Sequence, residues 1–126
     1  MNTEIVAKNL SNNANLEYGN WEYCFMRVDF TEKYPSYSGL CILENNYPDW
    51  LNLQDSKACD VLLDIAMDKK KNIEDSKSMT VTEIIFITNK KGLSDIRYST
   101  LNSPIWKFED YDEFNLQQFL EGGHGA

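Results

Sequence analysis

Apolar residues recur at the i, i+3, i+4, i+7, i+8 spacing of a helical face over the stretch from Asp55 to Ile73. The side chain of Asp55 or Ser56 can cap the amino end of such a helix, because a short oxygen side chain accepts a hydrogen bond from a free backbone N–H group. The lysines at 69–71 complement the partial negative charge of its carboxyl end. We therefore predict a helix here, with a buried face made of Ala58, Val61, Leu62, Ile65 and Ala66.

Four segments have the alternating or β-branched pattern of strands, two before this helix and two after it. The first covers residues 21–30 and is apolar on both sides. Its side with Trp21, Tyr23 and Phe25 is expected either to be covered by a terminal element or to form an exposed contact surface. The other three strands are expected at 37–44, 79–88 and 93–100.

These elements predict a single α+β domain over residues 1–121. Its centre would be one small antiparallel sheet of about four strands, formed by two hairpins that the central helix joins. Short terminal helices are expected at 3–16 and 113–121. Residues 45–54 are rich in turn-forming asparagine, proline and aspartate, so we expect a loop there. The glycine-rich end at 122–126 is expected to be a flexible tail.

The charge of the chain is strongly acidic. Its 126 residues have the size of one domain, and 20 acidic residues against 12 basic ones give a formal net charge of −8. Nine of the acids lie between Glu17 and Asp64, and five lie between Leu101 and the end. Nucleic acid is therefore not expected as a direct ligand, because a phosphate backbone requires a basic surface. The excess of acids fits a basic partner, although solubility alone accounts for it equally well.

The cysteines and the hydropathy of the chain predict in which cellular compartment the protein is found. Cys24, Cys41 and Cys59 are odd in number and have no short spacing that would suggest a metal site. Each lies in or beside an apolar run, so we expect buried free thiols in a reducing environment. The amino end lacks the pattern of a signal peptide, and no stretch approaches the roughly 18 apolar residues of a membrane span. A cytoplasmic protein that acts without a membrane is expected.

Few residues of this sequence are suited to catalysis. Its single histidine, His124, lies in the glycine-rich end, and no nucleotide-binding, metalloprotease or hydrolase motif is present. We therefore expect a protein that is not an enzyme and that binds no cofactor and no metal. Carboxylates are abundant, so a carboxylate-dependent metal-binding enzyme stays open as an alternative.

Acidic and aromatic residues that could contact a partner gather first around the central helix. The expected loop before the helix carries Tyr47, Asp49 and Trp50, and aromatic residues dominate binding hot spots. The alternative is that Trp50 and Leu51 fill the gap between sheet and helix. Asp60 and Asp64 lie four residues apart on the solvent side of the helix, where like charges repel by a few tenths of a kcal/mol, roughly. A solvated surface explains them simply, and contact with a basic partner explains them functionally.

A second acidic cluster lies near the end of the chain. Glu109, Asp110 and Asp112 are interleaved with aromatic residues that include Tyr111. Acids alternating with aromatic rings are typical of a surface that mimics or blocks a nucleic-acid site. Asp112 could equally cap the helix that follows, which would still leave Glu109 and Asp110 free for contact.

In size, acidic charge, Asn/Lys/Ile-rich composition and strand–helix order, the chain resembles the immunity proteins of bacterial toxin–immunity systems, of the contact-dependent-inhibition or polymorphic-toxin type. The resemblance covers nearly the whole chain but rests on no motif, so no functional residue is carried over from it. It implies a protein that binds one cognate toxin domain, often a basic nuclease, and occludes its active site or substrate groove. The alternative is a homodimeric binding module of a mobile element, which would use the face with Trp21, Tyr23 and Phe25.

Overall fold

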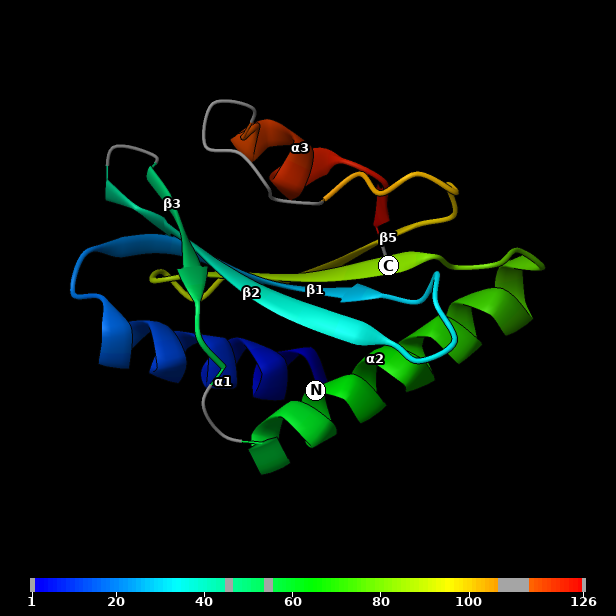
Figure 1. Ribbon diagram of the computed structural model, residues 1–126, viewed down its shortest axis with the longest axis horizontal. Helices are drawn as coiled ribbons and strands as arrows, with labels where there is room; N and C mark the ends of the chain where they lie inside the picture. The colour runs from blue at the N-terminus through cyan, green and yellow to red at the C-terminus, as the bar shows by residue number, and fades with distance from the viewer. Residues whose placement is uncertain (1, 45–46, 54–55, 107–113, 126) are drawn as a thin grey trace.

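The computed structural model describes residues 2–44, 47–53, 56–106 and 114–125. Its elements form three layers (Figure 1). Helices α1 (Asn2–Glu17) and α2 (Ser56–Lys77) lie on one face of an antiparallel sheet, and α3 (Leu116–Glu121) lies on the other. The predicted α+β class with a single antiparallel sheet is confirmed.

The sheet contains six described strands in the order β3-β2-β1-β4-β5-β6, and all neighbouring strands run antiparallel. The two predicted hairpins, β1–β2 and β4–β5, meet in the middle of the sheet because β1 pairs with β4. The strands are β1 (Trp21–Asp29), β2 (Ser36–Leu43), β3 (Tyr47–Leu51), β4 (Glu83–Asn89), β5 (Ser94–Ser99) and β6 (His124–Gly125).

The prediction of about four strands was wrong, because β3 and β6 come from segments whose composition is typical of a loop and a tail. β3 contains Pro48, which is tolerated on an edge strand because no ladder hydrogen bond needs its missing N–H. β6 pairs with Arg97 and Tyr98 of β5. The Arg97 guanidinium also donates hydrogen bonds to the backbone carbonyls of residues 121–123, which holds the preceding segment against the sheet.

α1 extends over 16 residues although its sequence is rich in asparagine. Val6, Leu10 and Ala14 lie on one side of this helix and are fully buried against the sheet. Asn9 and Asn13 donate their side-chain amides to backbone carbonyls four residues earlier. Burial of one helical face therefore outweighs the weak helix propensity of the asparagines, and the helix is longer than the short one predicted.

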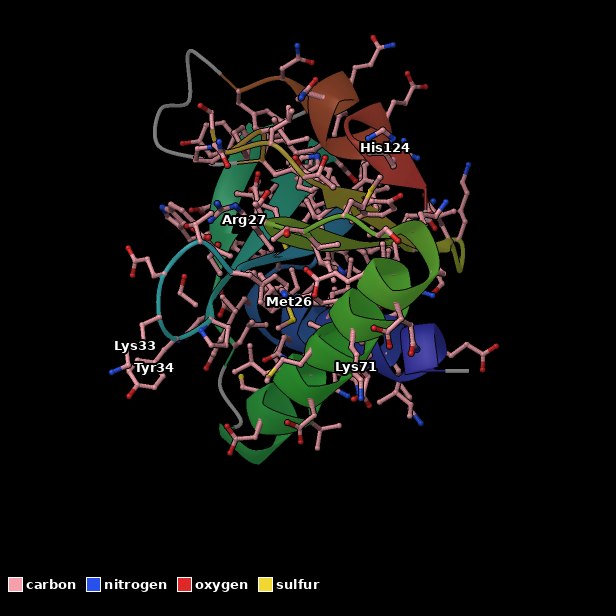
Figure 2. The ribbon with its side chains drawn as sticks, turned by 90° about the vertical axis from the view of Figure 1, so that its right-hand side faces the viewer. Met26, Arg27, Lys33, Tyr34, Lys71 and His124 are labelled. Carbon is pink, nitrogen blue, oxygen red and sulfur yellow. The ribbon has the colours of Figure 1, made fainter. Side chains whose placement is uncertain are left out.

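Both faces of the sheet carry a hydrophobic core. Met26 and Leu62 belong to the core on the helix side, and Figure 2 shows Met26 on the side of α2. Phe25 belongs to a second core on the opposite face, where it packs with Trp106 and Phe119. These two residues belong to the C-terminal segment, by which we mean the described residues after β5, 100–106 and 114–125. Of the two outcomes predicted for this face, the structure has the one in which a terminal element covers it.

A register shift between Trp21 and Tyr23 turns Trp21 to the helix side of the sheet. There its indole Nε1 donates a hydrogen bond to Asn15 Oδ1 at 2.8 Å. Tyr23 and Phe25 remain on the opposite face. The prediction that the three aromatic residues share one side was therefore wrong. Trp21 and Phe25 are both buried, so the contact face invoked for a homodimer is not exposed in this structure.

Glu83 of β4 is a buried carboxylate on the face that the C-terminal segment covers, and only 1% of it is exposed. Its Oε2 atom pairs with Arg27 Nε at 2.7 Å, and Arg27 also pairs with Asp29 at 3.2 Å. The other oxygen of Glu83, Oε1, accepts a hydrogen bond from the backbone N–H of Ile105 at 2.8 Å. The charge is thus compensated inside the protein, and the same carboxylate fastens the C-terminal segment to the sheet.

Replacing Arg27 alone should leave the Glu83 charge buried without its partner. We expect Arg27→Met to lower the free energy of unfolding by about 3 kcal/mol, measured by urea denaturation. The double variant Arg27→Met/Glu83→Gln should lose clearly less, because the amide oxygen can still accept from Ile105 and position 83 no longer carries a buried charge. Equal losses in the two variants would contradict the role assigned to this pair.

Candidate partner-binding surfaces

The three residues predicted as a contact site on β3 do not lie on one side of that strand. Asp49 is opposite Cys41 and therefore points to the helix side together with Tyr47. Trp50 is opposite Leu40, so it points to the face that the C-terminal segment covers. Tyr47 and Trp50 are about half exposed, at 53% and 48%.

Asp49 has a structural role at the edge of the sheet. Its Oδ1 atom accepts the backbone N–H of Trp50 at 2.9 Å. The Trp50 carbonyl accepts a hydrogen bond from the hydroxyl of Tyr18 at 2.7 Å. Partial burial, followed by the nearby Asp49 carboxylate, raises the pKa of Tyr18 far above its usual range, so this hydroxyl keeps its proton and donates. Both backbone groups of Trp50 are therefore occupied and cannot pair with an added strand.

The opposite part of the sheet has the same arrangement on β5. Asp95 Oδ1 accepts the backbone N–H of the following residue, Ile96, at 2.9 Å. β6 pairs with the two residues that follow, Arg97 and Tyr98. An aspartate thus caps a backbone N–H near each side of the sheet, on the edge strand β3 and on β5 beside β6. Such capping disfavours the addition of a foreign strand, and a partner would have to engage side chains instead.

The structural alternative, in which Trp50 and Leu51 both fill the gap between sheet and helix, is wrong for Trp50 and confirmed for Leu51. Leu51 is 4% exposed in the core on the helix side. Trp50 instead borders a small cleft that Trp106 and Phe119 also line. The structure thus places Trp50 close to the residue that precedes segment 107–113. The predicted contact residues of that segment, Glu109, Asp110, Tyr111 and Asp112, lie outside the described residues.

Asp60 and Asp64 are exposed on α2, as predicted. Asp68 is also exposed and continues their four-residue spacing. Two apolar residues of the same helix, Val61 and Met67, are 48% and 49% exposed. We call these five residues the α2 ridge.

The buried face of α2 differs in part from the one predicted. Leu62, Ile65 and Ala66 are buried as expected, and so is Cys59, whereas Val61 faces solvent. Ile73 adds to the buried face, and the side chain of Ala58 lies outside those that the structure describes. Val61 was predicted to be buried because its helical spacing places it at the border of a wide apolar stripe. A side chain at that border can face either the core or the solvent. The sequence signal for Asp68 was the regular interval of four residues after Asp60 and Asp64. The predicted contact residues on this helix were Asp60 and Asp64.

An open groove of about 440 Å³ adjoins the α2 ridge, and Met67 and Asp68 form part of its wall. Phe30 lies in it beneath Lys70, whose ammonium is 5.6 Å from the ring centre and 2.8 Å from Glu74 Oε1. The loop after β1 closes the other side, and Figure 2 shows Tyr34 projecting from it. Tyr34 is 73% exposed, which extends the apolar surface beside the ridge.

Few described groups are arranged for catalysis. His124 lies in β6, and its ring is 5.2 Å from the ring of Tyr98, so the tail segment expected to be flexible is paired at this point. Within the described ranges, no group of three His, Cys, Asp or Glu side chains is placed to hold a metal ion. The described helices also include none with the length and apolar character needed to span a bilayer.

Neither a protein-family model nor a curated protein matches the chain. A function for this protein must therefore be inferred from its own side chains. Carboxylates and apolar side chains lie together on the exposed side of α2, and an aromatic side chain is half exposed on the opposite face of the sheet.

The aspartate caps can be tested by removing them. We expect Asp49→Ala/Asp95→Ala to associate through its sheet edges, so that the mass measured by light scattering rises with concentration more steeply than for the natural protein. Asp60→Ala/Asp64→Ala removes the same charge from α2 and is the matched control. If both double variants behave alike, loss of charge rather than edge exposure would be responsible.

Proposed function

We propose that this protein is a non-catalytic immunity-type inhibitor that neutralises a cognate basic toxin domain of the nuclease class. It would do so by covering the active site or substrate groove of the toxin. The resemblance to immunity proteins and the net charge of −8 support this class of function. The α2 ridge is the single observation that carries the proposal.

The ridge combines the two ingredients of a tight interface with a basic protein. Asp60, Asp64 and Asp68 repel one another at their four-residue spacing, a cost that a basic partner would remove. Val61 and Met67 expose apolar surface beside these acids. Apolar anchors supply a desolvated centre of contact, while complementary charge raises the association rate and selects against wrong partners.

The mechanism is stoichiometric occlusion. Carboxylates of the ridge would occupy an electropositive cleft that otherwise holds the phosphates of a nucleic acid. Because α2 and Trp50 lie on opposite sides of the sheet, one partner would have to reach around the β3 edge to contact both. Trp50 is therefore a separate candidate contact. The acids at 109–112, which the sequence predicts as contacts, lie outside the described residues and require a test of their own.

The decisive measurement is binding to toxin domains encoded beside the gene of this protein, by titration calorimetry together with inhibition of nuclease activity. We expect Asp60→Lys/Asp64→Lys to weaken binding about 10- to 100-fold, mainly through a slower association rate at low salt. Glu22→Lys/Glu44→Lys changes the net charge equally at two exposed positions away from the ridge and should have little effect.

A third variant, Asp110→Lys/Asp112→Lys, tests the acidic cluster at 109–112 in the same assay. If no neighbour-encoded toxin binds, the proposed function is wrong. If a toxin binds tightly and both reversals leave its affinity intact, the inhibitor role stands but electrostatic recognition by these acids is wrong.

A further inference from the structure

Two of the three cysteines face each other across neighbouring strands in the core on the helix side. Cys24 of β1 is directly opposite Cys41 of β2, and their Sγ atoms are 3.2 Å apart. Both are free thiols, and neither is exposed to solvent. The third thiol, Cys59 on α2, donates a hydrogen bond to the backbone carbonyl of Leu53 at 3.6 Å.

The hydrogen-bond pattern of the sheet brings the two cysteine backbones close. In an antiparallel sheet the N–H and C=O of one residue point to the same neighbour, and this direction alternates along the strand. The N–H of Phe30 donates to Thr82 on the β4 side, and the β1–β4 register is unbroken back to Cys24, an even number of residues earlier. The backbone groups of Cys24 therefore also point to β4. Cys24 and Cys41 consequently form a non-hydrogen-bonded pair.

Residues in such a pair have their Cα atoms about 4.5 Å apart, which is the closest approach in an antiparallel sheet. A disulfide requires Cα atoms separated by about 4.4–6.8 Å and sulfur atoms about 2.05 Å apart. The typical spacing of a non-hydrogen-bonded pair falls within the first range. The second requires the two sulfur atoms to approach by only about 1 Å, which small side-chain rotations provide.

We propose that Cys24 and Cys41 are a site of disulfide formation, oxidised by thiol–disulfide exchange with a low-molecular-weight disulfide. The thiolate of one cysteine attacks the small disulfide and releases one small thiol. The second cysteine then attacks the protein sulfur of the mixed disulfide and releases the other small thiol. Two electrons pass from the protein dithiol to the small disulfide, and the two thiol protons leave with the released thiols. This site is independent of toxin binding.

Burial governs how fast this reaction runs. The hydrogen bond with Cys41, followed by burial, raises the pKa of Cys24 far above the ordinary cysteine value. Little thiolate therefore exists at neutral pH, and the oxidant must enter through a local opening of the strands. The bond should form slowly, should form faster as the pH rises, and should be shielded once the strands close over it.

The bond would join β1 and β2 without displacing the core, because the two sulfur atoms are already in contact. It would also constrain the unfolded chain by closing the loop from Cys24 to Cys41. For a loop of this length the melting temperature should rise by roughly 5–10 °C.

The test incubates the natural protein with hydroxyethyl disulfide at several pH values, then unfolds it and alkylates the remaining thiols. We expect one alkylated cysteine, Cys59, in place of three, and a linked Cys24–Cys41 peptide in mass spectrometry. The rate should keep rising between pH 8.5 and pH 10, roughly tenfold per unit, where an exposed thiol with an ordinary pKa of about 8.5 would level off.

Cys59→Ser is the matched control and should form the bond at the natural rate, whereas Cys24→Ser should form none. Peptide mapping of the natural protein needs neither variant to fold. A linked peptide containing Cys59, a stable mixed disulfide, or three alkylated cysteines after prolonged incubation at pH 10 would overturn the proposal.

Discussion

The structure depends on one constraint, which is that the central strands β1 and β4 are apolar on both faces. β4 shows this most clearly, because Ile84 and Phe86 enter the core on the helix side while Ile85 and Ile87 enter the other. A sheet of this kind cannot leave either face in water. α1 and α2 cover the first face, and the second is covered by the C-terminal segment with Trp106 and Phe119.

Covering the second face creates the most unusual electrostatic feature of the fold. Glu83 continues the alternation of Ile85 and Ile87, so its carboxylate points into the same layer and requires compensation. Arg27 of the neighbouring strand β1, diagonal to Glu83 in the pairing register, provides the charge, and Ile105 provides a backbone donor. Polar contacts of this kind also hold the chain end, through Arg97 and the carbonyls of residues 121–123. The C-terminal segment is therefore an integral layer of the domain.

The same architecture decides which surfaces are open to a partner. The sheet faces are buried, and Asp49 and Asp95 cap backbone N–H groups near its two edges. The exposed side of α2 remains, with three carboxylates and two apolar side chains. This is why the proposed recognition of a basic toxin is assigned to α2 rather than to the aromatic residues of β1, which the sequence offered as the alternative.

The sequence by itself determined the features that repeat over short distances. The amphipathic pattern of 55–73 located α2, and alternation located both hairpins, because local periodicity reflects one buried face. The end of α2 was extended to Lys77 by contacts beyond that pattern, including the Lys70–Glu74 ion pair and the burial of Ile73. Buried free cysteines and exposed Asp60 and Asp64 also followed from the sequence.

Only the tertiary structure decided the features that depend on a distant segment. β3 and β6 are strands because β2 and β5 offer them unpaired backbone groups, which turn-rich and glycine-rich sequences do not reveal. One register shift moved Trp21 to the other side of the sheet, and pairing on β3 divided Asp49 from Trp50. Cys24 and Cys41 likewise face each other because of the pairing register between β1 and β2. In a sheet with a two-residue period, a single step of register changes the face of every side chain, and that step is set by pairing rather than by local sequence.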